Sequence, residues 1–261
     1  MKRTYVKLLT VAGLTGCFLF TSCRSAQETT ARYEISKVEG NMITIDSTWD
    51  ANPDKKATTV LKPYKDKVDA MMYEVIGTSE MKMDKGTPES LLSNLVASVL
   101  QEAAAQVLGK PADMGLVNMG GLRNILPKGD ITVGAVFEIL PFENSLCVLT
   151  MKGTDMKRLF KAIASLHGEG VNGIRLEINK KGELLNATIG GKPVVDDQLY
   201  TVATIDYLAD GNGRMDAFLQ AEKRECPEDA TLRGLFLDYV RKQTAEGKII
   251  TSKLDGRITV K

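Results

Sequence analysis

Hydrophobic and polar positions alternate with two different periods along this chain, and each period predicts a different kind of element. Seven apolar residues between positions 91 and 103 recur at helical spacing: Leu91, Leu92, Leu95, Val96, Val99, Leu100 and Ala103. Before them, Thr87 is a candidate N-cap, Pro88 suits the first helical turn, and Glu89 adds an acidic side chain near the helix N-terminus. After them, Gly109-Lys110-Pro111 is a sequence that ends helices. The pattern predicts a core helix from about residue 87 to 107.

Other segments predict helices at 58–71, 154–165, 215–221 and 231–245, with Met156, Leu159, Phe160 and Ile163 expected in the core. Short apolar runs predict strands at 75–77, 115–118, 135–140, 146–150, 174–178, 185–189 and 200–205. Alternation around Gly40-Asn41 predicts a hairpin over residues 33–48. Because strands and helices mix without strict βαβ alternation, we predict an α+β fold with mixed sheets covered by helices.

The N-terminus predicts export and a lipid anchor. Lys2, Arg3 and Lys7 precede an uncharged stretch from Leu8 to Phe20, which is too short to cross a bilayer. The segment 20–23, Phe-Thr-Ser-Cys, is similar to a bacterial lipobox, so residues 1–22 are expected to be a signal peptide that is cleaved before Cys23. Residues 23–32 would then form a tether and residues 33–261 the domain. We expect this domain to be lipid-anchored in the bacterial cell envelope, either facing the periplasm or at the outer membrane. An ordinary signal peptide with a chance cysteine is the alternative.

The net charge bears on the class of binding partner, and the two remaining cysteines raise the question of a disulfide. Without the signal segment, 31 basic and 33 acidic residues remain, and this balance argues against binding to a nucleic-acid polymer. Cys147 lies in an apolar run and Cys226 in a loop sequence. A disulfide between them is chemically permitted outside the cytoplasm, but nothing in the sequence pairs them, and we expect them to stay separate.

Two segments carry candidate chemistry for binding a nucleotide. Asn118-Met119-Gly120-Gly121-Leu122-Arg123 puts two glycines, an amide and a guanidinium in one turn, and Pro141-Phe142-Glu143-Asn144 follows the next apolar run. Glycine lets the backbone approach a ligand, arginine matches a phosphate, and a phenyl ring can stack on a base. The alternative is a glycine-rich connection with an incidental arginine.

These segments, with Gly129-Asp130-Ile131-Thr132 and the stretch Asp206-Tyr207-Leu208-Ala209-Asp210-Gly211-Asn212-Gly213, are in the order and spacing of one family. From about Pro88 to Ala217 the chain resembles the C-terminal, substrate-binding domain of the 5'-nucleotidases. The resemblance implies a four-layer α/β/β/α arrangement with mixed sheets. Full-length relatives also carry an N-terminal dimetal phosphoesterase domain. Its histidine-rich motifs are absent here, where His167 is the single histidine. We therefore assign no catalytic residue, metal ligand or cofactor to this chain, and none of these roles to His167.

By the resemblance, Asn118 contacts the base, Arg123 binds the phosphate or sugar end, and Phe142 and Tyr207 sandwich the base. Gly120 and Gly121 complete the substrate-binding set, and Asn144, Asp210 and Asn212 are further candidates. For each residue a structural role is the alternative: an ordinary turn for Asn118, a carboxylate pair for Arg123, and core packing for the rings.

Three positions depart from the family pattern. Pro88 and Ser98 replace a common Arg and a common Asp, and Gly213 replaces the acid that holds ribose hydroxyls, with Asp210 and Asp216 as neighbours. The leading hypothesis is that the chain holds a nucleotide for a separate metallophosphoesterase chain that carries the divalent metals. The alternatives are a stand-alone lipoprotein that binds nucleotides or nucleosides, and a degenerate domain kept for protein contacts. Base, sugar, phosphate number, partner, membrane leaflet and oligomeric state do not follow from the sequence.

Overall fold

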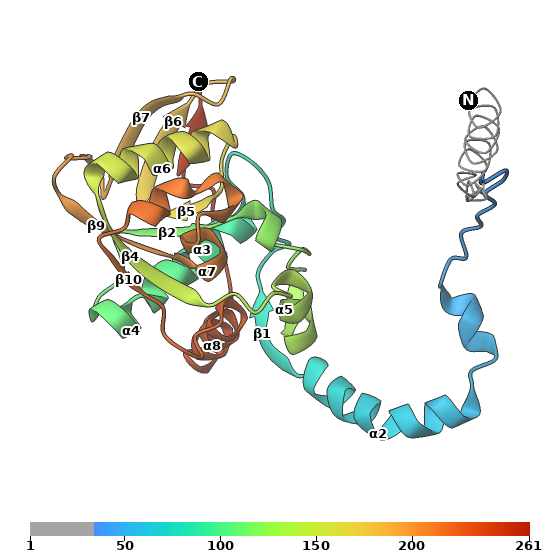
Figure 1. Ribbon diagram of the computed structural model, residues 1–261. Helices are drawn as coiled ribbons and strands as arrows, with labels where there is room; N and C mark the ends of the chain where they lie inside the picture. The colour runs from blue at the N-terminus through green and yellow to red at the C-terminus, as the bar shows by residue number, and fades with distance from the viewer. Residues whose placement is uncertain (1–33) are drawn as a thin grey trace, which may run out of the picture. The chain divides into compact units, whose positions relative to one another are not determined.

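The computed structural model describes residues 34–261, so the predicted signal peptide, Cys23 and the tether lie outside the described residues (Figure 1). The chain divides into two units, residues 1–53 and 54–261. In the described part of the first unit, Ser47–Ala51 forms the 3-10 helix η1, which the Asp46 side chain caps. The second unit holds every strand and the whole buried apolar core of residues 34–261.

The helices of the second unit are α2 (Lys55–Met72), α3 (Leu91–Ala103), α4 (Ala105–Leu108), η2 (Met119–Gly121), α5 (Val133–Ile139), α6 (Gly153–Ser165), α7 (Asp206–Ala209), η3 (Asn212–Arg214), η4 (Asp216–Gln220) and α8 (Leu232–Ala245). The strands are β1 (Val75–Ser79), β2 (Met114–Val117), β3 (Gly129–Thr132), β4 (Leu146–Lys152), β5 (Gly170–Asn172), β6 (Ile174–Ile178), β7 (Leu184–Ile189), β8 (Lys192–Pro193), β9 (Leu199–Ile205), β10 (Lys223–Glu225) and β11 (Ile258–Val260).

These strands form three sheets, and the two larger ones are mixed. The five-stranded sheet has the order β10-β4-β9-β2-β5, in which β2 runs parallel to β9 and the other neighbours are antiparallel. The four-stranded sheet has the order β11-β6-β7-β8 with β11 parallel to β6, and β1 pairs with β3 in a separate ribbon. The α+β class with mixed sheets is confirmed.

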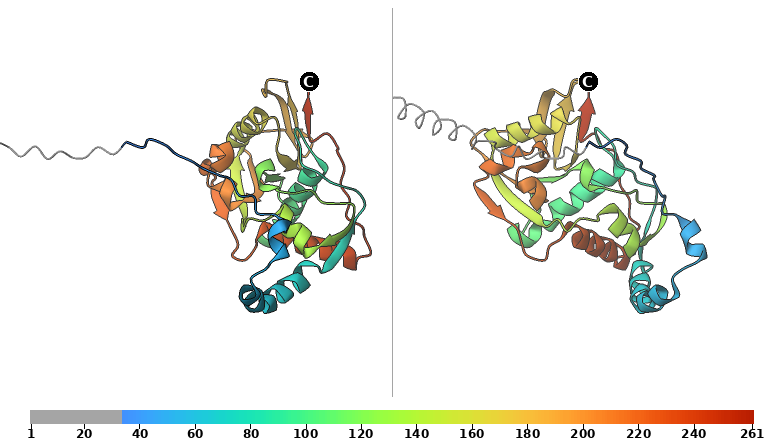
Figure 2. Two further views of the ribbon diagram at one scale, coloured as in Figure 1. Left: turned by 90° about the vertical axis from the view of Figure 1, so that its right-hand side faces the viewer. Right: turned by 45° about the vertical axis from the view of Figure 1, so that its right-hand side comes forward.

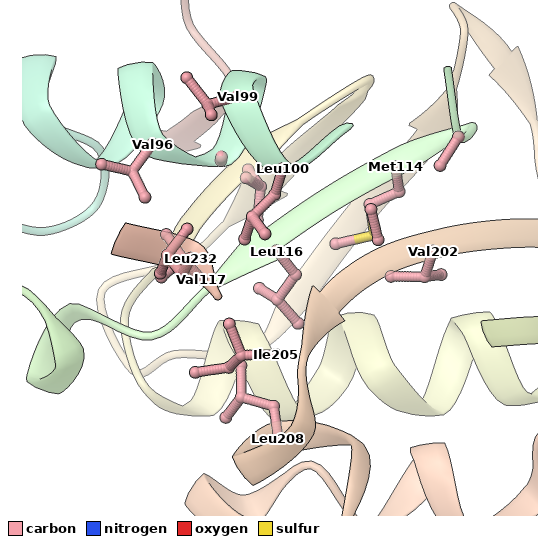
Figure 3. Packing of buried hydrophobic residues seen from close by; sticks show 14 of the residues in the cluster. Val96, Val99, Leu100, Met114, Leu116, Val117, Val202, Ile205, Leu208 and Leu232 are labelled. Carbon is pink, nitrogen blue, oxygen red and sulfur yellow. The ribbon is translucent and has the colours of Figure 1, made fainter. Parts of the chain in front are cut away.

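Helix α3 packs over β2 and β9 and fills the centre of the core (Figure 3). The Ser90 side chain caps its N-terminus in a reciprocal pair with Ser93. Its approach to β2 is so close that a Cβ added at Gly115 would lie 2.2 Å from the Ala97 carbonyl oxygen, which explains the glycine. This packing also explains why Leu91–Leu108, which is apolar enough for a membrane span, is half buried in the domain.

Four local predictions were wrong. The core helix begins at Leu91, because Ser90 and not Thr87 accepts the capping hydrogen bond. Residues 135–140 are not a strand: residues 135–139 lie in α5 and Leu140 is its C-cap. Thr132 caps the N-terminus of this helix, and Val133, Val136 and Ile139 turn one face to the core at helical spacing. No strand forms over 34–46, where the apolar side chains of the predicted hairpin are exposed. Residues 216–220 form a 3-10 helix and not an α-helix.

Cys147 and Cys226 form a disulfide, against our expectation. The bond spans 79 residues, so local sequence gave no sign of it. Strand β10 pairs with β4 so that Glu225 lies opposite Val148, and the next pair along the ladder brings Cys226 to Cys147. The sheet register therefore creates the disulfide.

Candidate functional site

The turn after β2 is shaped by the Asn118 side chain. A Cβ on Gly120 would lie 3.3 Å from Asn118 Nδ2, and one on Gly121 would lie 3.1 Å from Asn118 Oδ1. The amide thus lies against the backbone of both glycines, and a larger residue at either position would displace it. Asn118 Oδ1 is buried and accepts no hydrogen bond within the described residues. The amide is therefore held in place by packing and is not committed to a partner in the turn.

Two exposed aromatic side chains lie at one end of the five-stranded sheet. Phe142 follows α5, and Tyr207 is in the first turn of α7, directly after β9. The pairing of Leu146 with Ile205 brings the chain before β4 next to the chain after β9. Asn144 Nδ2 donates a hydrogen bond to Asp206 Oδ1 at 2.9 Å and ties these two segments together.

The turn and the aromatic residues enclose one cleft of about 330 Å³, a volume at the lower end of the range for small-molecule sites. Its lining residues are Asn118, Gly120, Gly121, Phe142, Asn144 and Tyr207. Phe142 is 49% exposed and Tyr207 43% exposed, so neither ring is a core residue. The arrangement offers two aromatic faces, two side-chain amides and an open glycine backbone, which suits a planar heterocycle with polar edges.

The other predicted residues lie outside the lining of this cleft. The exposed Arg123 side chain folds back, and its Nη1 donates to the Gly120 carbonyl oxygen at 3.2 Å. Asp210 pairs with Arg224 at 2.6 Å, and Asn212 is exposed at the start of η3. Gly213 is adjacent to the site, because a Cβ there would lie 3.8 Å from Tyr207 Cε1. A side chain at this position would reach the edge of the cleft, and here it is missing.

The two remaining departures from the family pattern have structural roles. Ser98 Oγ donates to the Asn94 carbonyl oxygen at 2.8 Å and receives a hydrogen bond from Arg257 Nη1 at 3.2 Å. The Pro88 backbone packs against Gly168, where a Cβ would lie 2.2 Å from the Pro88 carbonyl oxygen. Neither residue lines the cleft.

Glu169 is the residue at the site that sequence reasoning missed. It is 8% exposed, and its Oε2 accepts a hydrogen bond from the Met119 N–H, inside the turn that carries Asn118. Burial raises the pKa of Glu169 to about 7, and the hydrogen bond from Met119 acts in the opposite direction. The sequence did contain a sign of this residue: Glu169 lies between Gly168 and Gly170 at the start of an apolar run, and charged residues are unusual in such segments.

The described residues, 34–261, offer no ligand set that fits a dimetal centre. Within residues 34–261 no group of three or more His, Cys, Asp or Glu side chains lies close enough to hold a metal ion. The exposed His167 follows Leu166, the C-cap of α6, and has a φ of 60°. Its backbone N–H donates to the Ala164 carbonyl oxygen. Its place is that of a helix-terminating residue.

Comparison with known proteins identifies the family that residues 75–220 of this chain match. The family model for the 5'-nucleotidase C-terminal domain matches residues 75–220, more than half of the chain. The chain is 28% identical to the endonuclease YhcR of Bacillus subtilis over 188 residues, which cover 69% of this chain and 15% of that protein. It is 27% identical over 240 residues to the cell wall protein Lmo0130 of Listeria monocytogenes, covering 81% and 30%.

Among solved structures, a 5'-nucleotidase precursor from Thermus thermophilus superposes with a TM-score of 0.67 at 26% identity, covering 81% of this chain and 44% of that one. The chain thus spans less than half the length of each of these relatives.

Proposed function

This chain belongs to the 5'-nucleotidase C-terminal domain family, and on that premise we propose that its cleft binds a nucleotide and presents it to a separate metallophosphoesterase chain. One observation carries the proposal: three segments that are distant in sequence bring Asn118, Phe142 and Tyr207 to a single cleft of about 330 Å³.

In the proposed complex, the base stacks between Phe142 and Tyr207, whose exposed rings are available for it. Stacking on one ring contributes on the order of 1–3 kcal/mol. The Asn118 amide lies beside the base edge, with Oδ1 free of any competing donor within the described residues. Arg123 rotates away from Gly120 to meet the phosphate, because a charge-assisted bond to phosphate is stronger than one to a neutral carbonyl.

In this scheme the present chain orients the substrate and the partner carries out the chemistry. The chain binds no cofactor, and the divalent metals belong to the partner. We expect the purified chain to show no phosphatase activity with any divalent metal. Turnover of a nucleoside monophosphate that a substitution in this chain abolishes would contradict the division of labour.

A second candidate is a stand-alone nucleotide- or nucleoside-binding lipoprotein, or a degenerate interaction module. Gly213 favours it, since the position beside Tyr207 lacks the acid expected from the family. A secreted metallophosphoesterase encoded next to this chain would favour the split-enzyme proposal over this candidate.

We also propose a location in the cell envelope, through lipidation at Cys23. A relative described as a cell wall protein supports an envelope location. Two or more acyl chains anchor a protein stably, whereas one binds only marginally. A Cys23→Ala variant should leave the membrane fraction, and continued sedimentation with membranes would contradict the anchor.

Isothermal titration calorimetry of residues 34–261 with a panel of nucleosides and nucleotides tests the binding proposal. We expect binding of at least one purine or pyrimidine nucleotide that Phe142→Ala and Tyr207→Ala each weaken. Absence of binding at millimolar concentration would refute nucleotide presentation and favour the degenerate module.

A further inference from the structure

Helix α2 presents an apolar surface that no other part of residues 54–261 buries. Ala57, Leu61, Tyr64, Val68 and Met71 are spaced alternately four and three residues apart, so they form one stripe along the helix, which we name the α2 stripe. No residue of α2 is buried, and Leu61, Tyr64, Val68 and Met71 are 50–69% exposed. Contiguous exposed apolar surface of this kind is typical of an interaction site.

Only the C-terminal end of α2 is attached to the domain (Figure 1, Figure 2). There the Val133 N–H donates to the Glu74 carbonyl oxygen, Arg241 pairs with Glu74, and the Met72 backbone lies against Gly134. The stripe starts near the free end of the helix and ends at Met71, directly before this attachment, and the exposed side chains of Leu61, Tyr64, Val68 and Met71 are not buried by residues 54–261. It is therefore available to a partner without any rearrangement of the fold.

Contacts within α2 do not outweigh the cost of the proline in its interior. Asp54 caps it, and the pairs Lys62–Asp66 and Lys65–Asp69 lie along its polar face. Each such exposed pair contributes roughly 0.3–0.5 kcal/mol, whereas Pro63 inside the helix removes a backbone hydrogen bond and costs more than both together. Amphipathic helices in proteins owe most of their stability to the packing of their apolar face. The helix thus needs a surface for its stripe.

We propose that the α2 stripe is the docking surface for the metallophosphoesterase chain, inserted as a helix into an apolar groove bordered by carboxylates. This inference rests on the proposed function, and it identifies where the two chains join. Helix α2 ends at Met72 and the family match begins at residue 75. The matched family is a C-terminal domain, so in longer relatives the rest of the protein comes before it in sequence. Helix α2 lies directly before the matched region, at the position that corresponds to this junction between domains.

Charge favours an acidic partner over a second copy of this chain. The sequence of α2 contains five lysines against two aspartates, and both aspartates are already paired within the helix. Two copies packed through their stripes would bring two such basic helices together, which is unfavourable. Lysines beside an apolar stripe instead complement a groove with acidic borders.

Site-specific photo-crosslinking in the bacterial host tests the proposal with the full, natively processed chain. Benzophenone-phenylalanine replaces Leu61 or Val68 on the stripe, and Thr59 or Ala70 on the opposite side of α2 as matched controls. We expect the stripe positions, and not the controls, to yield one adduct whose partner is identified by mass spectrometry as a metallophosphoesterase. Adducts to a second copy, to lipid or to an unrelated protein, or no adducts above the controls, would overturn the inference.

Two double variants that introduce aspartates on either side of α2 test whether the stripe is needed to bind the phosphoesterase. Leu61→Asp combined with Val68→Asp should reduce the phosphoesterase recovered with this chain at least tenfold, while Thr59→Asp combined with Ala70→Asp should not. Both double variants should retain nucleotide binding and melting temperature, because α2 lies outside the cleft and the core. If wild-type chain binds no nucleotide, the proposed function fails. If binding holds but stripe variants recover the enzyme normally, only the docking surface fails.

Discussion

Replacing Glu169 with glutamine should remove a pH dependence from the stability of the domain. The carboxyl group is 8% exposed, and burial raises its pKa from 4.5 to about 7. Between these two values the folded protein binds more protons at this site than the unfolded chain does. The contribution of the protonated group to stability is therefore fully present below about pH 4.5, and it is lost as the pH rises through about 7. The difference between the two pKa values corresponds to roughly 3 kcal/mol.

Glutamine has the size of glutamate and can still accept the hydrogen bond from the Met119 N–H, but it does not ionise. At pH 5 the free energy of unfolding of Glu169→Gln should lie within about 1 kcal/mol of wild type, since both side chains are neutral in the fold. At pH 8 the variant should be the more stable protein by up to roughly 3 kcal/mol. The stronger hydrogen bond that a carboxylate accepts from Met119 offsets part of this gain.

Urea unfolding of residues 34–261, followed by far-ultraviolet circular dichroism from pH 5 to pH 8 at constant ionic strength, measures this difference. Glu228→Gln is the matched control, because Glu228 is exposed and should leave the pH profile of wild type unchanged. If Glu169→Gln and wild type lose stability in parallel as the pH rises, or if the variant is the less stable protein at pH 8, the burial argument is wrong.

Further expectations concern the cleft and the disulfide. Phe142→Ala or Tyr207→Ala should weaken nucleotide affinity roughly 5- to 150-fold in calorimetry, the equivalent of 1–3 kcal/mol of stacking, with little change in melting temperature because both rings are exposed; unchanged affinity would remove the rings from the site. Gly121→Ala should weaken the same binding by displacing the Asn118 amide, which lies 3.1 Å from the added Cβ, and an unaltered affinity would make the amide irrelevant. Ribo- and deoxyribonucleotides should bind within a few-fold of each other, since Gly213 supplies no acid for the ribose; a large preference for one would require another hydroxyl ligand. The double variant Cys147→Ala, Cys226→Ala should lose about 2–4 kcal/mol of stability in urea unfolding, with wild type in reductant as the comparison; equal stability would show that the sheet alone holds β10 in place.

The candidate site was predictable from the sequence as a set of residues but not as a shape. The motif positions indicated Asn118, Phe142 and Tyr207, and the structure places all three on one cleft. Glu169 carried no motif, because its significance comes from burial next to a turn some 50 residues away. For Arg123 the sequence indicated a candidate ligand but not where its side chain points. Its orientation toward the Gly120 carbonyl oxygen depends on the local packing of the turn.

The sequence by itself determined mainly local features, namely the helices and the buried faces that follow from the spacing of apolar residues a few positions apart. The spacing of Met156, Leu159, Phe160 and Ile163 predicted the buried face of α6. The amphipathic pattern over residues 58–71 predicted α2, which begins three residues earlier, at Lys55. The predicted strand at 135–140 was wrong, because a short apolar run fits a strand as well as a buried helix unless the cap at Thr132 is recognised. Such choices depend on side chains that are close in sequence, so a periodic pattern carries most of the information.

The tertiary structure decided everything that depends on register between distant strands. Pairing of β10 with β4 brought Cys147 to Cys226, and pairing of β4 with β9 brought Phe142 and Tyr207 to the same cleft. Within residues 54–261 it also left the α2 stripe exposed, although the amphipathic pattern of the helix is local. Register and docking are set by the summed burial of many residues from separate segments, and that sum is not encoded in any one of them.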